Sequence, residues 1–170
     1  MGMATNSGCR NLNKVPIMKT KPSTLRLAYF ELSPGAYKGF IAAGEALKAS
    51  PLGKQLIDLV FLRVSLINGC AYCVDLHWRD LIALDVDPRR INSISTWHEN
   101  DFFSPRECAA LNWAEVVTRI GETRARDADF NALKEHFSDA EIADLTFAIA
   151  LMNAWNRTAI SMRQPVPQQP

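Results

Sequence analysis

Helix-start signals recur along the chain and restrict its fold to helices. A serine or aspartate, which can cap a helix through its side-chain oxygen, directly precedes a proline, which suits the first helical position. Such pairs occur at Ser33-Pro34, Ser50-Pro51, Asp87-Pro88 and Ser104-Pro105, and full capping boxes at 104–107 and 138–141. Because strand-like alternation is nearly absent between these signals, we predict an all-α fold built as one compact domain.

The predicted helices span residues 34–48, 51–68, 70–85, 88–97, 104–121, 127–136 and 138–162, the last with a candidate break near Asn153. Apolar residues recur at helical spacing within several of them. These stripes are Leu52, Leu56, Leu59, Val60, Val64 and Ile67; Trp113, Val116, Val117 and Ile120; and Phe130, Leu133 and Phe137. We predict that they form the core. The domain spans residues 23–163, between a polar N-terminal tail or arm (1–22) and an extended C-terminal tail (164–170).

The composition favours a globular protein without a charged partner. Of 170 residues, 48% are apolar and 22% charged, and the net charge is +1. This balance gives no basis for binding nucleic acid or an anionic membrane. No apolar stretch reaches the length of a membrane span, and no signal-peptide pattern precedes the helices. We therefore expect a cytoplasmic location, where four cysteines indicate redox or metal chemistry rather than a disulfide framework.

The chemistry concentrates in the segment Cys70-Ala-Tyr-Cys73-Val-Asp-Leu-His77, which follows Gly69. If Gly69 turns the chain and a helix begins near Cys70, then Cys70, Cys73 and His77 share one helical face. A thiolate at a helix N-terminus is stabilised by unpaired backbone N–H groups, which lower its pKa. The pattern therefore predicts a redox-active dithiol with a histidine one turn away.

The cysteine pair has two other interpretations. A structural zinc site needs four ligands, and Cys70, Cys73 and His77 supply three with no partner spacing elsewhere. Two buried, inert cysteines are the second alternative. Within a redox pair, the helix start favours Cys70 as the attacking sulfur, whereas the neighbouring His77 favours Cys73. The residues alone leave that choice open.

Residues 63–77, Arg-Val-Ser-Leu-Ile-Asn-Gly-Cys-Ala-Tyr-Cys-Val-Asp-Leu-His, resemble the core signature of the alkyl hydroperoxidase D family within the carboxymuconolactone decarboxylase-like superfamily. Segments 103–111, 114–118 and 153–157 agree with the superfamily pattern, so the resemblance covers roughly residues 30–162. It implies an all-helical homo-trimer or homo-hexamer of the alkyl hydroperoxidase D-like type. Members of the alkyl hydroperoxidase D family reduce hydroperoxides, or a partner peroxiredoxin, with electrons from a dithiol or lipoyl-type donor. No metal, flavin or other cofactor is required.

The resemblance also implies roles for individual residues. Cys73 corresponds to the peroxidatic sulfur, Cys70 to its resolving partner and His77 to a proton relay. Asp58 occupies the position of a relay glutamate, with a carboxylate at an interface or on the surface as the alternative. Tyr72 occupies the position of a histidine in the peroxidase-active branch. Tyr72 is therefore an accessory candidate for proton transfer, with packing as the alternative.

Distances along the two helices separate Asp58 from His77. Asp58 lies about 15 Å back from the turn and His77 about 10 Å beyond it, at about 1.5 Å per residue. We therefore expect a water molecule to bridge the two side chains.

The sequence thus predicts a thiol-dependent peroxidase, an antioxidant oxidoreductase that works through its C-x-x-C dithiol. One alternative is a decarboxylase or lactone-handling enzyme of the same superfamily. Another is a non-catalytic oligomer that senses redox state through its disulfide.

Overall fold

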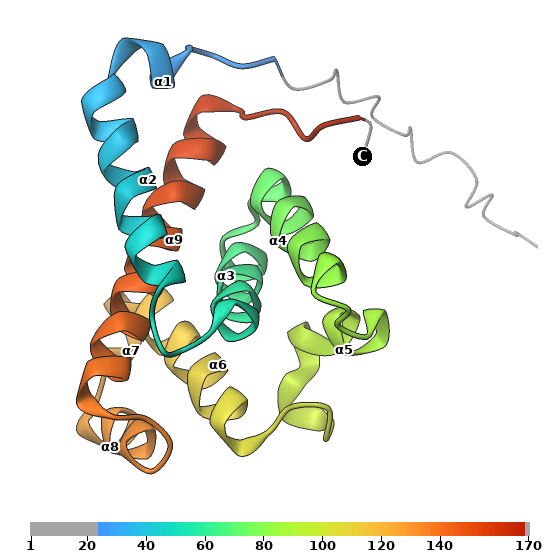
Figure 1. Ribbon diagram of the computed structural model, residues 1–170, viewed down its shortest axis with the longest axis vertical. Coiled ribbons are helices and arrows are strands. Elements are labelled where there is room, and N and C mark those ends of the chain that lie inside the picture. Colours follow the sequence, from blue (N-terminus) through green and yellow to red (C-terminus); the bar gives the residue numbers. More distant parts are fainter. Residues whose placement is uncertain (1–23, 169–170) are drawn as a thin grey trace, which may run out of the picture.

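The computed structural model describes residues 24–168, and within this range it consists of helices without strands (Figure 1). The predicted all-α fold is therefore confirmed. The elements are α1 (Tyr29–Leu32), α2 (Pro34–Lys48), α3 (Lys54–Asn68), α4 (Ala71–Ala83), α5 (Pro88–Asn92), the 3₁₀ helix η1 (Ser93–Glu99), α6 (Pro105–Thr118), α7 (Ile120–Thr123), α8 (Asp127–Lys134) and α9 (Asp139–Met162). The predicted N-terminal tail, 1–22, lies outside the described residues.

Helix α3 is the central element of the domain. It packs against α4, α6 and α9, while α2 lies along α9 and α8 lies against α6 (Figure 1). One side of α3 places Leu56, Val60 and Val64 in the larger core cluster, and another places Leu59 and Leu62 in a second cluster. Because α3 is buried on several sides, its position determines where its neighbours can lie.

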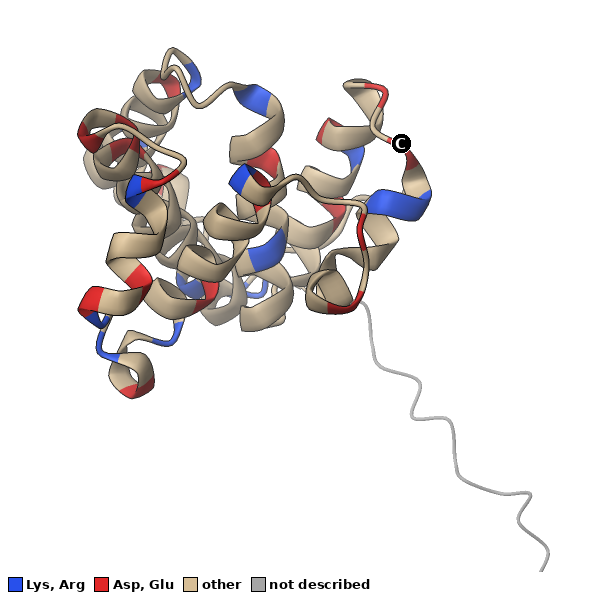
Figure 2. Ribbon diagram, turned by 90° about the horizontal axis from the view of Figure 1, so that it is seen from below, with Lys and Arg blue, Asp and Glu red and all other residues tan. Residues whose placement is uncertain are grey.

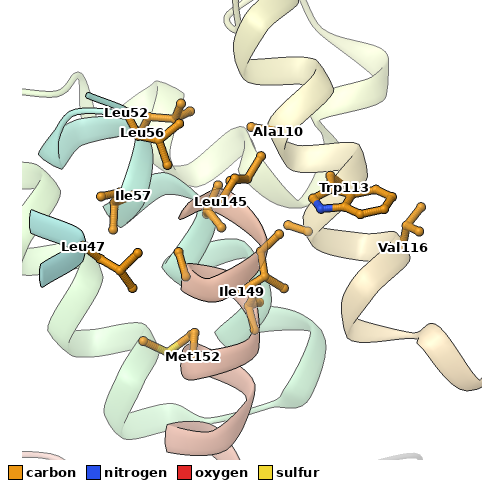
Figure 3. Packing of buried hydrophobic residues seen from close by; sticks show 14 of the residues in the cluster. Leu47, Leu52, Leu56, Ile57, Ala110, Trp113, Val116, Leu145, Ile149 and Met152 are labelled. Carbon is orange, nitrogen blue, oxygen red and sulfur yellow. The ribbon is translucent and has the colours of Figure 1, made fainter. Parts of the chain in front are cut away.

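The larger core cluster joins helices that are distant in sequence. Figure 3 shows Trp113 of α6 facing Leu145 and Ile149 of α9, with Leu56 and Ile57 of α3 on the other side. Leu145 and Ile149 are completely buried. The predicted stripes are buried as expected, except that Ile67, Val117 and Phe130 are partly buried and Ile120 is 55% exposed. Ile120 is exposed because α6 ends at Thr118 and the short α7 begins a new direction.

The predicted side-chain caps form at three helix starts and fail at two. Helix α2 begins at Pro34 as predicted, but the Ser33 side chain makes no capping hydrogen bond. Asp87, Ser104 and Ser138 each accept a backbone N–H at the start of a helix, and the latter two form complete capping boxes. The helix predicted to begin at Pro51 instead begins at Lys54, after Gly53 with a φ of 80°. Ser50 caps a turn instead of a helix, because its hydroxyl accepts from the Leu52 N–H at 3.4 Å and its carbonyl accepts from the Gly53 N–H at 3.2 Å. The same hydroxyl donates to Asp144 of α9 at 2.5 Å, which ties this turn to α9.

Three predicted helices differ in their course. The segment 88–97 divides into α5 and the 3₁₀ helix η1, which is interrupted by non-helical backbone angles at Thr96. The segment 104–121 divides into α6 and α7. Helix α9 runs without a break through Asn153, whose side-chain amide donates to the Ile149 carbonyl one turn earlier. The polar residue is thus accommodated inside the helix.

A buried ion pair joins α3 to α6. The Arg63 guanidinium donates to Glu115 Oε1 through Nε at 3.0 Å and Nη2 at 2.7 Å, and Trp97 Nε1 donates to the same oxygen at 2.8 Å. Burial alone would raise the pKa of Glu115, but the donors Trp97 and Arg63 hold it below its ordinary value. Since each charge is matched by hydrogen bonds, this pair orients α6 and η1 against α3.

Charged residues are interspersed on the outside of the domain. Figure 2 shows lysine and arginine mixed with aspartate and glutamate in this view, rather than gathered by sign. Within residues 24–168, no helix is long and apolar enough to cross a membrane.

Candidate active site

A tight turn between α3 and α4 presents the cysteine pair. Gly69 ends α3 with a φ of 71°, a left-handed conformation that favours glycine. The Cys70 N–H then donates to the Ser65 carbonyl at 3.0 Å, which closes the turn. Cys70 is the N-cap of α4, and its Sγ accepts from the Cys73 N–H at 3.4 Å. The predicted turn and helix start are therefore present, with Cys70 in the capping position.

The two thiols are free, buried and close enough to share a proton. Cys70 is 1% exposed and Cys73 is 4% exposed. A hydrogen bond from the Cys73 thiol lowers the pKa of Cys70 to about 7, although burial opposes this shift. The pKa of Cys73 is raised, because its proton is held by the Cys70 sulfur and because the side chain is buried. In the reduced pair, the negative charge therefore resides preferentially on Cys70.

Amide side chains from α9 support the turn from behind. Asn68 Nδ2, at the end of α3, donates to Asn156 Oδ1 at 2.9 Å and to Asn153 Oδ1 at 3.0 Å. Asn156 is fully buried and donates to Ser65 Oγ at 3.1 Å. It also contributes to lowering the pKa of Cys70. The sequence alone did not assign Asn153 and Asn156 to the site. The signal that could have indicated them is the presence of two amide side chains within an otherwise apolar helix.

His77 and Asp58 face each other directly across α3 and α4. His77 Nδ1 lies 3.4 Å from Asp58 Oδ1 and 3.7 Å from Asp80 Oδ2. The expectation that a water molecule bridges the two side chains was wrong. It considered only how far each residue lies along its own helix axis. Helices α3 and α4 pack closely side by side. The two side chains thereby come within direct reach despite their axial offset.

Lys54 keeps the Asp58 carboxyl group charged. Its Nζ lies 2.6 Å from Asp58 Oδ2, one helical turn earlier on α3. Burial alone would raise the pKa of Asp58, but the His77 imidazole and the Lys54 ammonium lower it below its ordinary value. Asp58 is therefore a carboxylate at neutral pH, with one oxygen turned to Lys54 and the other to His77.

His77 Nδ1 is buried and forms no well-aligned hydrogen bond within the described residues. The ring packs against Phe61 with centroids 5.0 Å apart. Among these residues, one group of three possible metal ligands lies close together, namely Asp58, His77 and Asp80, and no cysteine belongs to it. This arrangement differs from the zinc site weighed from the sequence. The ammonium of Lys54 already provides a positive charge beside Asp58.

A cavity of about 390 Å³ opens onto one of the two sulfurs. Cys73, His77 and Tyr72 of α4 line it, together with Phe61 of α3 and Trp155 of α9. Cys70 and Asp58 lie behind this lining. The structure thus brings together the predicted residues Cys70, Cys73, His77 and Asp58, and gives only Cys73 direct access to a molecule in the cavity.

Tyr72 lies at the cavity wall as part of an aromatic lining. It is half-buried, and burial raises its pKa above the ordinary tyrosine value. The phenol is therefore neutral at physiological pH and can donate a hydrogen bond.

Comparisons with known proteins found relatives of this chain in sequence and in fold. The chain is 34% identical over 137 residues to the uncharacterized protein YdfG of Bacillus subtilis, which covers 81% of this chain and 93% of that protein. It is similar to a crystal structure of a protein of unknown function from Agrobacterium tumefaciens, proposed to be the antioxidant defence protein AhpD, with a TM-score of 0.82 and 39% identity over 86% of this chain and 100% of that one.

A second solved structure is the alkylhydroperoxidase AhpD core of an uncharacterized peroxidase-related protein from Ralstonia eutropha. Its TM-score is 0.73 and its identity 26%, over 82% of this chain and 74% of that one. The model of the carboxymuconolactone decarboxylase family matches residues 34–116, which include the whole α3–α4 turn. The helical fold, the turn and these matches together show that the chain belongs to the carboxymuconolactone decarboxylase family, among its AhpD-like members.

Proposed function

We propose that the protein is a thiol-dependent peroxidase that reduces hydroperoxides through Cys70 and Cys73. The observation that carries this proposal is a buried dithiol whose Cys73 faces a cavity together with His77. The peroxidase-related and antioxidant descriptions of the AhpD-like neighbours support the same chemistry.

The proposed reaction balances without a cofactor. The Cys73 thiolate attacks the O–O bond of ROOH, so that Cys73 becomes a sulfenic acid and the leaving alkoxide takes a proton to become ROH. Cys70 then condenses with the sulfenic acid to form the disulfide and release water. An external dithiol of the lipoyl type returns two electrons by thiol–disulfide exchange. A partner peroxiredoxin would instead be an oxidant of the reduced pair, because the pair would reduce its disulfide.

The proton shared by the sulfurs has to move before attack. At rest the charge lies preferentially on Cys70, whereas the cavity reaches Cys73. Transfer of the Cys73 proton to Cys70 or to His77 places a thiolate at the cavity wall. His77 is positioned to exchange a proton there, because it lines the same cavity and is oriented by the Asp58 carboxylate. Tyr72 is an accessory donor at the same wall.

We also propose that the protein assembles as a homo-trimer or homo-hexamer. A groove between α2 and α9 is lined almost entirely by apolar side chains, including Phe40, Phe147, Ala150 and Ala154. Phe147 is 71% exposed. A second copy of the chain is the occupant that would remove this apolar surface from water.

Light scattering, which measures the mass of the assembly in solution, tests this prediction with one substitution in the groove and one control outside it. Phe147→Glu should reduce the trimer or hexamer to smaller species, because it places a charge in the apolar groove. Phe102→Glu, at another exposed phenylalanine outside the groove, should leave the mass unchanged. A stable wild-type monomer at micromolar concentration would contradict the assembly.

Peroxide treatment of the reduced protein should produce one intramolecular disulfide, between Cys70 and Cys73. The N-cap sulfur lies 3.4 Å from the Cys73 amide, so little movement is needed to join the two sulfurs. Mass spectrometry of tryptic peptides provides the measurement. Cys73→Ser should block oxidation of Cys70, whereas Cys108→Ser should have no effect, since Cys108 lies outside the cavity lining. An unlinked pair after stoichiometric oxidation would exclude the proposed mechanism. It would also exclude the redox-sensing oligomer, and would leave the decarboxylase alternative.

The resting charge on Cys70 leads to a pH-dependence prediction. In a protein carrying Cys9→Ser and Cys108→Ser, thiolate ultraviolet absorbance should rise with an apparent pKa of about 7. Cys73→Ala should move this titration upward, because Cys70 loses its thiol hydrogen-bond donor. Cys73→Ser should move it less, because a hydroxyl can still donate. A titration near 9.0, the ordinary cysteine value, in the parent protein would show that the sulfurs do not share a proton.

The relay is tested by single-turnover oxidation of the reduced pair against pH. His77→Ala should slow oxidation near neutral pH by about 10²–10⁴-fold, the usual contribution of a general acid–base group, and much of the rate should return at high pH. Asp58→Asn should cost less, since it removes only the orientation of His77. Asp80→Asn is the matched control, because Asp80 is farther from His77 and its side chain is 40% exposed. Equal rates for wild type and His77→Ala across the pH range would assign His77 to packing.

A further inference from the structure

Segments from the two ends of the described chain form the roof of the cavity. Tyr29 and Phe30 of α1, and Gln164 beyond α9, line it. The Arg26 N–H donates to the Met162 carbonyl at 2.8 Å, and the Tyr29 hydroxyl donates to Gln164 Oε1 at 3.3 Å. Figure 1 shows α1 and the end of α9 side by side. This roof lies outside residues 34–116, the part that matches the family model.

Aromatic side chains from helices α1, α2, α3 and α9 line the cavity wall. Tyr37 of α2 meets Trp155 of α9 edge to face, with centroids 5.4 Å apart and planes at 83°. Tyr29 continues this group, with its centroid 6.0 Å from that of Tyr37. Phe61 lies beside His77, near the sulfur. Edges and faces of rings are thus available to a flat ligand, and such contacts add to the gain from burying its surface.

The lining lacks a partner for a charged ligand. Among the described residues that line the cavity there is no lysine, arginine, aspartate or glutamate, and the polar groups are tyrosine hydroxyls, His77, Cys73 and Gln164. A carboxylate brought into this cavity would lose its hydration without gaining a lysine or arginine partner, which is costly. The imidazole of His77 already faces the carboxylate of Asp58, so any positive charge on it is matched there. The cavity is also within the range of roughly 300–1,000 Å³ that accommodates organic ligands, far more than hydrogen peroxide fills.

We infer that the roof and wall form a binding site for an uncharged aryl group, so that the preferred substrate is a neutral aryl hydroperoxide whose peroxide end reaches Cys73. This inference rests on the proposed peroxidase function and specifies its substrate class. Trp155 and Tyr37 are specificity-determining residues, because they contact the ring and lie apart from the sulfur pair. Hydrogen peroxide would use the same sulfur without this contact.

The kinetic test compares three oxidants in single-turnover oxidation of the reduced pair: cumene hydroperoxide, its para-carboxylate analogue and hydrogen peroxide. The neutral aryl compound should react fastest. Trp155→Ala should lower the ratio of the cumene to the hydrogen peroxide rate by about tenfold, as expected for a lost aromatic contact with its buried area. Trp78→Ala, at a 43% exposed tryptophan outside the lining, should leave this ratio unchanged. Trp155→Phe should retain part of it.

A binding test separates the substrate class from the chemistry. Cumyl alcohol, the unreactive product, should bind the Cys73→Ala protein in calorimetry. Adding Trp155→Ala to this variant should weaken the binding of cumyl alcohol. The para-carboxylate analogue of cumyl alcohol should bind the Cys73→Ala protein poorly. If no peroxide oxidises the pair but cumyl alcohol binds, the proposed peroxidase function fails and the aryl site stands. If the carboxylate analogue reacts or binds as well as the neutral compound, or if the rate ratio is insensitive to Trp155, the aryl site is wrong.

Discussion

The hydrogen bond from the Cys70 N–H to the Ser65 carbonyl is the constraint on which the site depends. It forms only because Gly69 adopts a left-handed conformation, which reverses the chain within two residues of the end of α3. The reversal lays α4 along α3 and leaves Cys70 at the N-cap of the new helix. One local turn thereby places both sulfurs at the end of a helix and starts the packing that brings His77 to Asp58.

The polar groups around this turn are buried, and their hydrogen bonds make that burial tolerable. Asn68, Ser65 and Asn156 bond to one another where α3 meets α9. On another face of α3, Arg63 is matched by Glu115. Buried polar groups of this kind stabilise one arrangement of helices over others, because any shift leaves a donor or acceptor unpaired. The site is therefore held in place from behind by α9 as well as by the turn itself.

The two sulfurs divide the requirements of the proposed chemistry. Cys70 receives the hydrogen bonds that stabilise a thiolate, whereas Cys73 faces the cavity. A similar division applies to the proposed proton relay, in which Lys54 keeps the short acid Asp58 charged while His77 faces both Asp58 and the cavity. The shorter side chain at position 58 still reaches the histidine, because the two helices pack closely. Substitution of a family glutamate by aspartate is thus compatible with a working relay.

Local sequence determined the features that depend on neighbouring residues. Capping at Asp87, Ser104 and Ser138, the turn at Gly69 and the shared face of Cys70, Cys73 and His77 all follow from interactions within one or two helical turns. Tertiary packing decided the rest. Ser50 bonds to Asp144 of α9, Asp58 meets His77 without a bridging water, and the aromatic cavity is closed by chain segments more than a hundred residues apart. These contacts depend on how whole helices lie against one another, and helical periodicity specifies which face a residue occupies but not which distant side chain it will meet.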